Sequence, residues 1–278
     1  MTFDQTVLIW CLAVPAGISI AGCLVAKWSR QEFGAAIVSA TWWLAVTAAL
    51  VGFMGWQWWP EDAWRQAVWP LLAWSILIGG TVLWGGSDSW RWVLAGLLAI
   101  GTGAIAMPGG SGWEDTLGQH RTWAALIGAS CLANAFALES LARTGGHRWS
   151  LLVALAALAG PMAMAASTYG SLAQWAFAMI VATLVIATLA VFSPLESGFW
   201  AAAIPVTAGG AGIAAAGRFY SYDTHPMWLY AAVLFLPVMI TVIDLPLRKR
   251  NPWIRVIVSG LGSAAIAGLC IWRLLLGS

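Results

Sequence analysis

The segment 218–228 gathers side chains that could bind a polar carbonyl compound and move protons. Arg218 and Tyr220 can donate hydrogen bonds, and Asp223 with His225 is the pair best suited by type to accept and release protons. A quinone head group needs hydrogen-bond partners for two carbonyls, an aromatic or apolar slot and a proton acceptor. These four residues are therefore candidates for a quinone site, and their types equally fit solvated residues at the ends of helices.

Two further polar segments, 57–65 and 112–123, are expected on the same side as 218–228. Each mixes carboxylates, aromatic residues and an arginine. Such a mixture suits a quinone pocket or a docking surface for a partner subunit. The residues that we interpret as a partner-docking surface are Glu61, Asp62, Arg65, Asp115, His120 and Arg121.

These polar segments are short links between long apolar stretches. The chain has 278 residues, of which 61% are hydrophobic and 9% are charged. No water-soluble domain of this size could cover so much apolar surface. Ten stretches are long enough to cross a hydrocarbon core of about 30 Å. The predicted fold is an all-α, multi-pass membrane protein, one integral membrane domain over 1–278, with ten spans at 6–26, 34–56, 68–85, 92–108, 122–142, 149–166, 171–192, 198–217, 226–245 and 254–275.

The basic residues predict an orientation, because links rich in Lys and Arg stay in the cytoplasm. Four of the 13 basic residues lie on the side of the polar segments: Arg65, Arg121, Arg218 and Arg273. The others lie in the alternate links or at their helix ends. The expected location is a bacterial inner membrane, with both termini and the three polar segments on the periplasmic side.

A block of the chain recurs about a hundred residues later. Asp88 and Asp115 return as Glu196 and Asp223, each 108 positions on (196−88, 223−115). After a short gap, the pairs separated by 105 positions (225−120, 248−143) are His120 and His225, Trp123 and Trp228, Glu139 and Asp244, and Arg143 and Arg248. This spacing predicts two and a half copies of a four-helix unit, at approximately 1–67, 68–170 and 171–278.

Two carboxylates near the predicted cytoplasmic ends are expected to be structural. Glu139 and Asp244 each precede an arginine, Arg143 and Arg248, by four residues, which suits an ion pair on one helix face. An exposed pair contributes about 1 kcal/mol or less, so Glu139→Gln should alter stability little. Asn134 is the deepest polar residue expected in the membrane interior. Almost no ionisable groups are expected there, and their scarcity disfavours a proton-driven carrier.

Neither a metal nor a haem is expected in this chain. The three histidines fall near opposite ends of the predicted helices, whereas a transmembrane haem needs paired ligands at matched depth. The four cysteines, Cys11, Cys23, Cys131 and Cys270, lie in apolar stretches without Cys-x-x-Cys spacing. We interpret them as small core residues.

Three other residue types predict how the helices pack. Small residues over 208–217 let helix backbones approach closely. The 21 tryptophans gather near the predicted interfaces and are expected mainly to anchor helices at headgroup depth. Four prolines lie within predicted spans and can kink them: Pro15, Pro161, Pro205 and Pro237.

The outer segments resemble those of DMSO reductase membrane-anchor subunits. Arg218 and Tyr220, followed by Pro226 and Trp228, are similar to that family's loop between its two helix bundles. The run 60–65, with Trp74 beyond it, is similar to the stretch between its second and third helices. The membrane anchors of this family and of its polysulfide-reductase relatives consist of repeated four-helix bundles without haem, so the resemblance implies the same architecture here. It also implies exchange of electrons between a quinone near the outer face and an iron–sulfur subunit docked there.

The sequence departs from this family at the residues that should handle quinol protons. Trp56 stands where the family has a histidine, and Ile78 aligns with its glutamate. The family also usually has eight helices. Either the quinone site has moved toward His225, or the chain is an anchor that holds a complex together without binding quinone. A small-solute transporter is the main alternative from another functional class, because repeated, kinked helices also describe carriers.

Overall fold

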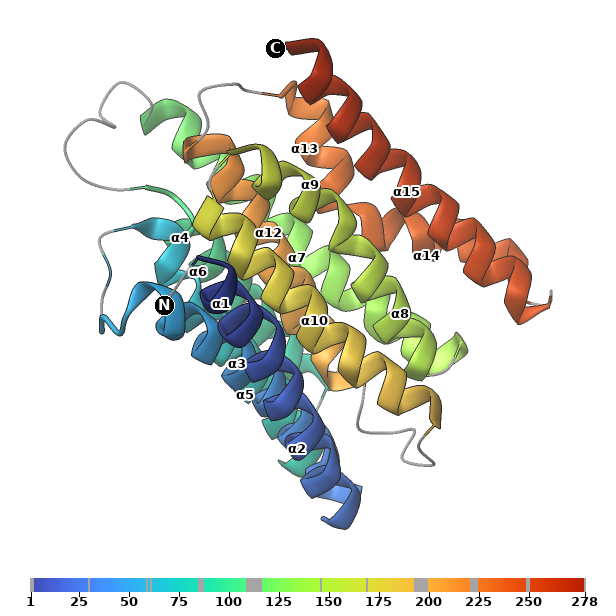
Figure 1. Ribbon diagram of the computed structural model, residues 1–278. Coiled ribbons are helices and arrows are strands. Elements are labelled where there is room, and N and C mark those ends of the chain that lie inside the picture. Colours follow the sequence, from blue (N-terminus) through green and yellow to red (C-terminus); the bar gives the residue numbers. More distant parts are fainter. Residues whose placement is uncertain are drawn as a thin grey trace.

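Helices account for nearly all of the chain that the structure describes. The computed structural model describes residues 3–29, 31–58, 60, 62–84, 88–108, 117–145, 147–168, 170–192, 200–220, 225–248 and 251–277, and no strand occurs among them. Figure 1 shows the helices packed as a bundle, with α15 along one edge. The all-α architecture and the apolar helices of a multi-pass membrane protein are as predicted.

The elements follow one another with short links. They are α1 (Phe3–Thr6), a π-helical stretch η1 (Val7–Ala13), α2 (Val14–Trp28), α3 (Gln31–Met54), α4 (Ala63–Gln66), α5 (Val68–Trp84), α6 (Asp88–Ile105), α7 (Leu117–Gly145), α8 (His147–Ala157), α9 (Ala159–Thr168), α10 (Gly170–Phe192), a 3-10 turn η3 (Trp200–Ala202), α12 (Ala203–Tyr220), α13 (Met227–Leu234), α14 (Leu236–Leu247) and α15 (Pro252–Gly277).

The structure does not by itself confirm the ten membrane-spanning helices that the sequence predicts. Within the described residues, six are long and apolar enough, or seven if the bent pair α13 and α14 counts as one span. The described parts of α5, α6 and α12 are only 17 or 18 residues long. A helix needs about 20 residues to span a typical hydrocarbon core, and this length separates these three from the others.

Two breaks in the helices lie just before prolines. α8 gives way to α9 at Leu158, three residues before Pro161, and α13 gives way to α14 at Phe235, two residues before Pro237. The axes of α13 and α14 differ by 59°. A proline has no N–H for the carbonyl four residues earlier, so the helical hydrogen bonds are interrupted at these points.

The side chain of Asn134 on α7 compensates for the break between α13 and α14. Its Nδ2 donates a hydrogen bond to the carbonyl oxygen of Leu234, the last residue of α13, at 2.8 Å. Because an unsatisfied carbonyl is costly in an apolar interior, this bond stabilises the bent form. The deepest polar residue that the sequence indicates therefore has a structural partner.

The run of small residues forms the packing centre of the bundle. Every residue of α12 from Ala203 to Gly217 is buried, and the helix packs against α5, α7, α8, α9 and α10. α6 and α7 also approach closely. A Cβ atom at Gly103 would collide with the carbonyl oxygen of Ala124, and one at Gly128 would lie 2.8 Å from that of Ala99. Small residues thus allow backbones to touch, as expected.

The tryptophans divide into two groups rather than forming belts alone. Trp56 and Trp58 are exposed beside the first polar segment, whereas Trp42, Trp74 and Trp175 are fully buried. The indole N–H groups of the buried three donate to Thr183 Oγ1, Thr102 Oγ1 and the Val46 carbonyl, respectively. Burial of an indole is favourable once its N–H has an acceptor, which hydropathy alone does not reveal. All four cysteines are buried and free, as predicted for core residues.

Candidate functional site

The two ends of the bundle carry different polar groups. The end with His120 and His225, where α7 begins and α12 ends, is termed the histidine end. The end with Arg143 and Arg248, where α7 and α14 finish, is termed the arginine end. All the proposed quinone-binding and partner-docking residues that the structure describes lie at the histidine end, and both predicted ion pairs lie at the arginine end.

Arg218 and His225 face one cavity at the histidine end. Arg218 is in the last turn of α12, and His225 precedes the N-cap residue of α13, Pro226. The cavity has a volume of about 310 Å³ and is lined by Gln119, Thr122, Trp123, Arg218, His225 and Met227. This volume is at the lower end of the range for small-molecule sites. The third candidate in this group, Asp223, lies outside the described residues.

Among the described residues, the contacts of the Arg218 guanidinium group are with neutral side chains. Its Nη2 donates to Gln119 Oε1 at 3.4 Å, and its Cζ is 5.6 Å from the centroid of the Trp123 ring. A second ring, that of Phe219, lies 5.8 Å away. The cation–π contacts and the long hydrogen bond to the Gln119 amide orient the arginine without neutralising its charge. Arg218 can therefore still attract an electron-rich or anionic group in the cavity.

Tyr220 belongs to a different cluster from Arg218 and His225. Two residues along a helix correspond to about 200° of rotation, so Tyr220 and Arg218 lie on opposite faces of α12. The Tyr220 hydroxyl accepts a hydrogen bond from the Ala63 N–H at 3.1 Å, which ties α12 to α4. Burial raises the pKa of Tyr220 above its usual value. Helix geometry thus separates Tyr220 from Arg218 and His225, with which the sequence grouped it.

The proposed docking residues also divide between surface and interior. Arg65 is buried, with Nη2 3.5 Å from the Gly55 carbonyl and Nη1 3.9 Å from Asp62 Oδ2. It holds the first polar segment together and does not face a partner. Asp62 is partly exposed and Arg121 is exposed. Glu61 and Asp115 lie outside the described residues.

His120 is part of an aromatic cluster beneath the cavity. It is buried, and its ring meets the ring of Phe219 edge-on at 5.1 Å. Trp123 lies 5.2 Å from Tyr230, and His225 lies 6.0 Å from the same ring. His120 therefore supports the floor of the site instead of forming an outer docking surface.

Four of the lining residues fall within the predicted polar segments 112–123 and 218–228 but were not singled out as site residues. Gln119, Thr122 and Trp123 are spaced i, i+3 and i+4, so they share one face of α7. This helical spacing could have grouped them, but nothing in the sequence indicated that their face meets α12. Met227, the fourth, begins α13. Trp56, at the family's histidine position, instead packs its ring 6.3 Å from those of Trp58 and Trp69, and Ile78 is buried.

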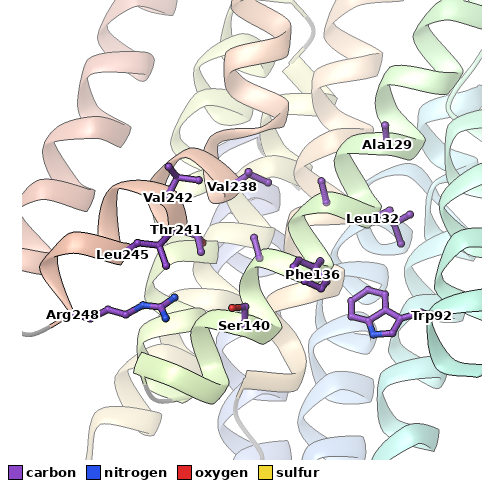
Figure 2. A pocket seen from close by; sticks show the side chains of 12 residues that line it. Trp92, Ala129, Leu132, Phe136, Ser140, Val238, Thr241, Val242, Leu245 and Arg248 are labelled. Carbon is purple, nitrogen blue, oxygen red and sulfur yellow. The ribbon is translucent and has the colours of Figure 1, made fainter. Parts of the chain in front are cut away.

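A larger, mainly apolar groove lies nearer the arginine end. It has a volume of about 730 Å³, and it lies between α7 and α14 with Trp92 of α6 at its far side. Figure 2 shows Phe136 and Trp92 near one another on one side, and Arg248 and Ser140 toward the arginine end. Figure 2 also shows Val242 and Leu245 along α14.

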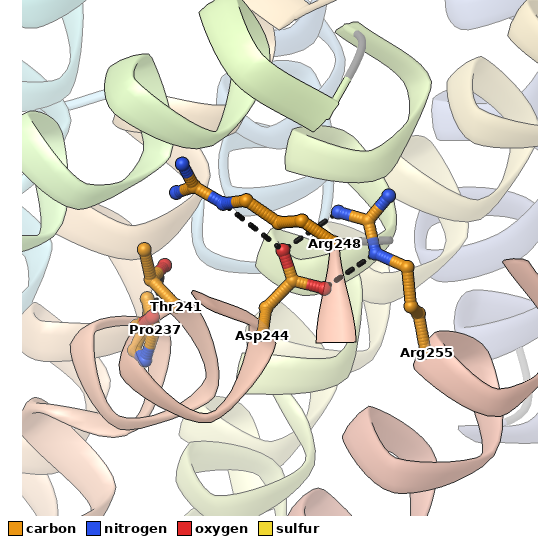
Figure 3. A network of polar contacts seen from close by, with 5 residues as sticks. All are labelled: Pro237, Thr241, Asp244, Arg248 and Arg255. Atoms are coloured by element: carbon orange, nitrogen blue, oxygen red, sulfur yellow. Dashed lines mark hydrogen bonds and ion pairs between the residues drawn. The ribbon is translucent and has the colours of Figure 1, made fainter. Parts of the chain in front are cut away.

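Glu139 and Asp244, at the arginine end, each have two arginine partners instead of the single one predicted. Oε1 of Glu139 lies 2.6 Å from both Arg143 Nη2 and Arg91 Nη2. Asp244 is held by two short hydrogen bonds from Arg255, at 2.5 and 2.6 Å, whereas Nε of Arg248 is 3.9 Å away (Figure 3). Arg255 stacks over Trp149 at 5.0 Å. Both acids are buried, so these are not exposed helix-surface pairs.

Within the described part of the chain, no three His, Cys, Asp or Glu side chains come together to hold a metal ion. Comparisons of the whole chain with protein-family models, with curated proteins and with solved structures find no match in any of the three.

Proposed function

We propose that this chain is a membrane-anchor subunit of a respiratory oxidoreductase complex, with a quinone or quinol site at the histidine end. The observation that carries the proposal is the cavity where the cation of Arg218 and the imidazole of His225 meet aromatic and amide side chains. Arg218 and Gln119 supply hydrogen-bond donors for quinone carbonyls, Trp123 supplies a ring for stacking, and His225 exchanges a proton. Tyr220 then serves to position α12 rather than to touch the ligand.

The proposed arrangement in the membrane has ten spans made of two and a half repeats, with both termini and the histidine end facing the periplasm. The short helices α5, α6 and α12, added to the seven candidate spans that include the bent pair α13 and α14, make up the ten. Support for the repeat comes from Glu139 with Arg143 and Asp244 with Arg248, which form related contacts at the same end. The bacterial inner membrane is the proposed location, because it hosts such respiratory complexes. An iron–sulfur subunit then docks over the exposed Asp62 and Arg121.

Photoaffinity labelling with an azido-quinone tests the site directly. The purified chain in a mild detergent should be labelled within 119–123 or 225–228, and excess unmodified quinone should suppress the labelling. His225→Ala should reduce it and lower quinol-dependent turnover of the assembled complex. Arg121→Ala is the matched control for the labelling of the purified chain, because this exposed side chain does not line the cavity. Undiminished labelling in His225→Ala, or labelling at another cavity, would refute the site.

Co-purification tests the anchor role separately. Extraction in mild detergent should recover iron–sulfur and catalytic subunits with this chain. If they co-purify while no quinone binds, the subunit is purely structural, which is the outcome that Trp56 and Ile78 favour. Recovery of the chain alone as a homo-oligomer would contradict the anchor role.

One observation favours a small-solute transporter instead. The broken pair α13 and α14 places a helix end beside Asn134 inside the bundle, a feature common in carriers. The enclosed cavity at this point, lined in part by Asn134, Thr207 and Pro237, has a volume of only about 10 Å³. That is about one water molecule, too small for a substrate, so the anchor role is preferred.

A further inference from the structure

The groove between α7 and α14 has the length and the composition of a site for one lipid chain. Along α7 its lining runs from Ala129 to Ser140, a rise of about 16 Å. Half of a hydrocarbon core of about 30 Å is about 15 Å, so the groove is as long as one leaflet is thick. Phe136, Val242 and Leu245 in its walls are exposed, which is favourable only against an apolar medium.

The end of the groove has an excess of positive charge. Among the described residues, four arginines and two carboxylates form ion pairs there, and these six side chains together carry a charge of +2 (4−2). Arg255 engages Asp244 through both carboxylate oxygens. Arg248, which lines the groove, is left 3.9 Å from that carboxylate, too far for a hydrogen bond.

The guanidinium group of Arg248 has donors that the described residues do not use. Its Nε and Nη2 atoms are buried and make no hydrogen bond within the described parts of the chain. Figure 3 shows its guanidinium directed away from Arg255, and Figure 2 shows it at the arginine end of the groove. A buried cationic donor beside an apolar channel favours an anionic group attached to a hydrocarbon chain.

We propose that this groove binds an anionic phospholipid, with its phosphate on Arg248 and one acyl chain between α7 and α14. The site lies at the opposite end of the bundle from the proposed quinone cavity and does not depend on it. The lipid would fill the space between the two helices and neutralise the surplus charge at the arginine end. Arginine near a membrane surface attracts anionic lipid, which agrees with the leaflet that the basic residues predict.

Native mass spectrometry of the full chain can test this. The purified protein is mixed in detergent with equal amounts of dioleoyl phosphatidylglycerol and dioleoyl phosphatidylcholine, and bound lipids are counted by mass. The wild type should prefer phosphatidylglycerol. Arg248→Gln should lower that preference about fivefold, the effect of one basic residue near anionic lipid. Arg248→Lys should retain most of it, and Arg121→Gln, at the other end, should retain all of it.

A second variant tests the acyl-chain part of the site. Ala133 lines the groove and is only partly buried, so Ala133→Trp should fill the channel and remove binding of both lipids while the protein still folds. Glycerol 3-phosphate, which has the charge but no chain, should not compete. Equal binding of the two lipids by the wild type would overturn the proposal, as would an unchanged preference in Arg248→Gln. Recovery of a quinone or a partner helix in this groove would overturn it too.

Discussion

The arginine end and the histidine end use charged side chains in opposite ways. At the arginine end, Glu139 and Asp244 are buried and each contacts two arginines. At the histidine end, Arg218 lies against a neutral amide and aromatic rings, beside an open cavity. Buried, paired charges are costly to disturb, whereas an arginine with neutral partners retains its capacity to bind a ligand. The difference indicates that Glu139 and Asp244 maintain the bundle, whereas Arg218 keeps the donors that the proposed ligand needs.

Asp244→Asn should have the largest effect on stability. Its carboxylate is almost fully buried, and the substitution removes the negative charge that accepts two hydrogen bonds from Arg255. Breaking a buried pair from one side costs about 3–5 kcal/mol. Denaturant unfolding in detergent should show this loss, while quinone binding per folded molecule stays unchanged. The matched control is Asp62→Asn, since Asp62 is partly exposed. A loss no greater than in that control would remove the distinction between the two ends.

Glu139→Gln should cause the next largest loss of stability. The sequence predicted little change in stability for this substitution, and the structure revises that expectation. The carboxylate has only 8% of its side chain exposed, and Arg91 beside it has 15%. Removing the charged acceptor of the Arg91 hydrogen bond should cost about 1–3 kcal/mol. Arg143 is 58% exposed and can return to solvent, so the loss should be smaller than in Asp244→Asn. The same unfolding assay checks this order, and the reverse order would contradict it.

Arg218→Gln should separate function from stability. Removing the charged donor should weaken binding of a quinone analogue by about 1–3 kcal/mol, measured by calorimetric titration. The free energy of unfolding should change by about 0.5 kcal/mol or less, as for surface substitutions elsewhere. Arg121→Gln should change neither quantity. A marked loss of stability in Arg218→Gln would mean that the histidine end is also structural.

Trp74→Phe should have the smallest effect and should not distinguish the two ends. It removes the hydrogen bond from the indole to Thr102 Oγ1, which lies in the core and still donates to the Leu98 carbonyl. A loss of about 1 kcal/mol is expected for one such bond. Unfolding should report this loss, and quinone and lipid binding should be unchanged. A change in either binding measurement would show that the core between the ends couples them.

The sequence was most informative where a property is local or depends on composition. Apolar content and stretch length indicated membrane helices, and the i,i+4 spacing placed Arg143 near Glu139. It did not predict Arg91 or Arg255 as partners, because these come from neighbouring helices. It also treated Arg65 and His120 as surface residues, whereas both side chains are buried.

The predicted repeat shows the same division between local pattern and tertiary context. Trp123 and Trp228 have equivalent positions in the pattern, yet Trp123 is buried under the cavity and Trp228 is 60% exposed. Their helices differ as well, because α7 continues unbroken where Pro237 bends its counterpart. Identical spacing does not produce identical surroundings when one helix is bent.

The sequence by itself determined that this chain forms apolar helices and which residues carry charge, and two of the four prolines that it singled out, Pro161 and Pro237, follow breaks in the helices. These follow from backbone hydrogen bonding and from the cost of exposing apolar surface. Only the tertiary structure decided that Arg218 shares a cavity with His225 and not with Tyr220, and that Arg255 displaces Arg248 from Asp244. Such choices depend on how helices distant in sequence rotate and pack against each other, and no periodicity within a single helix records that.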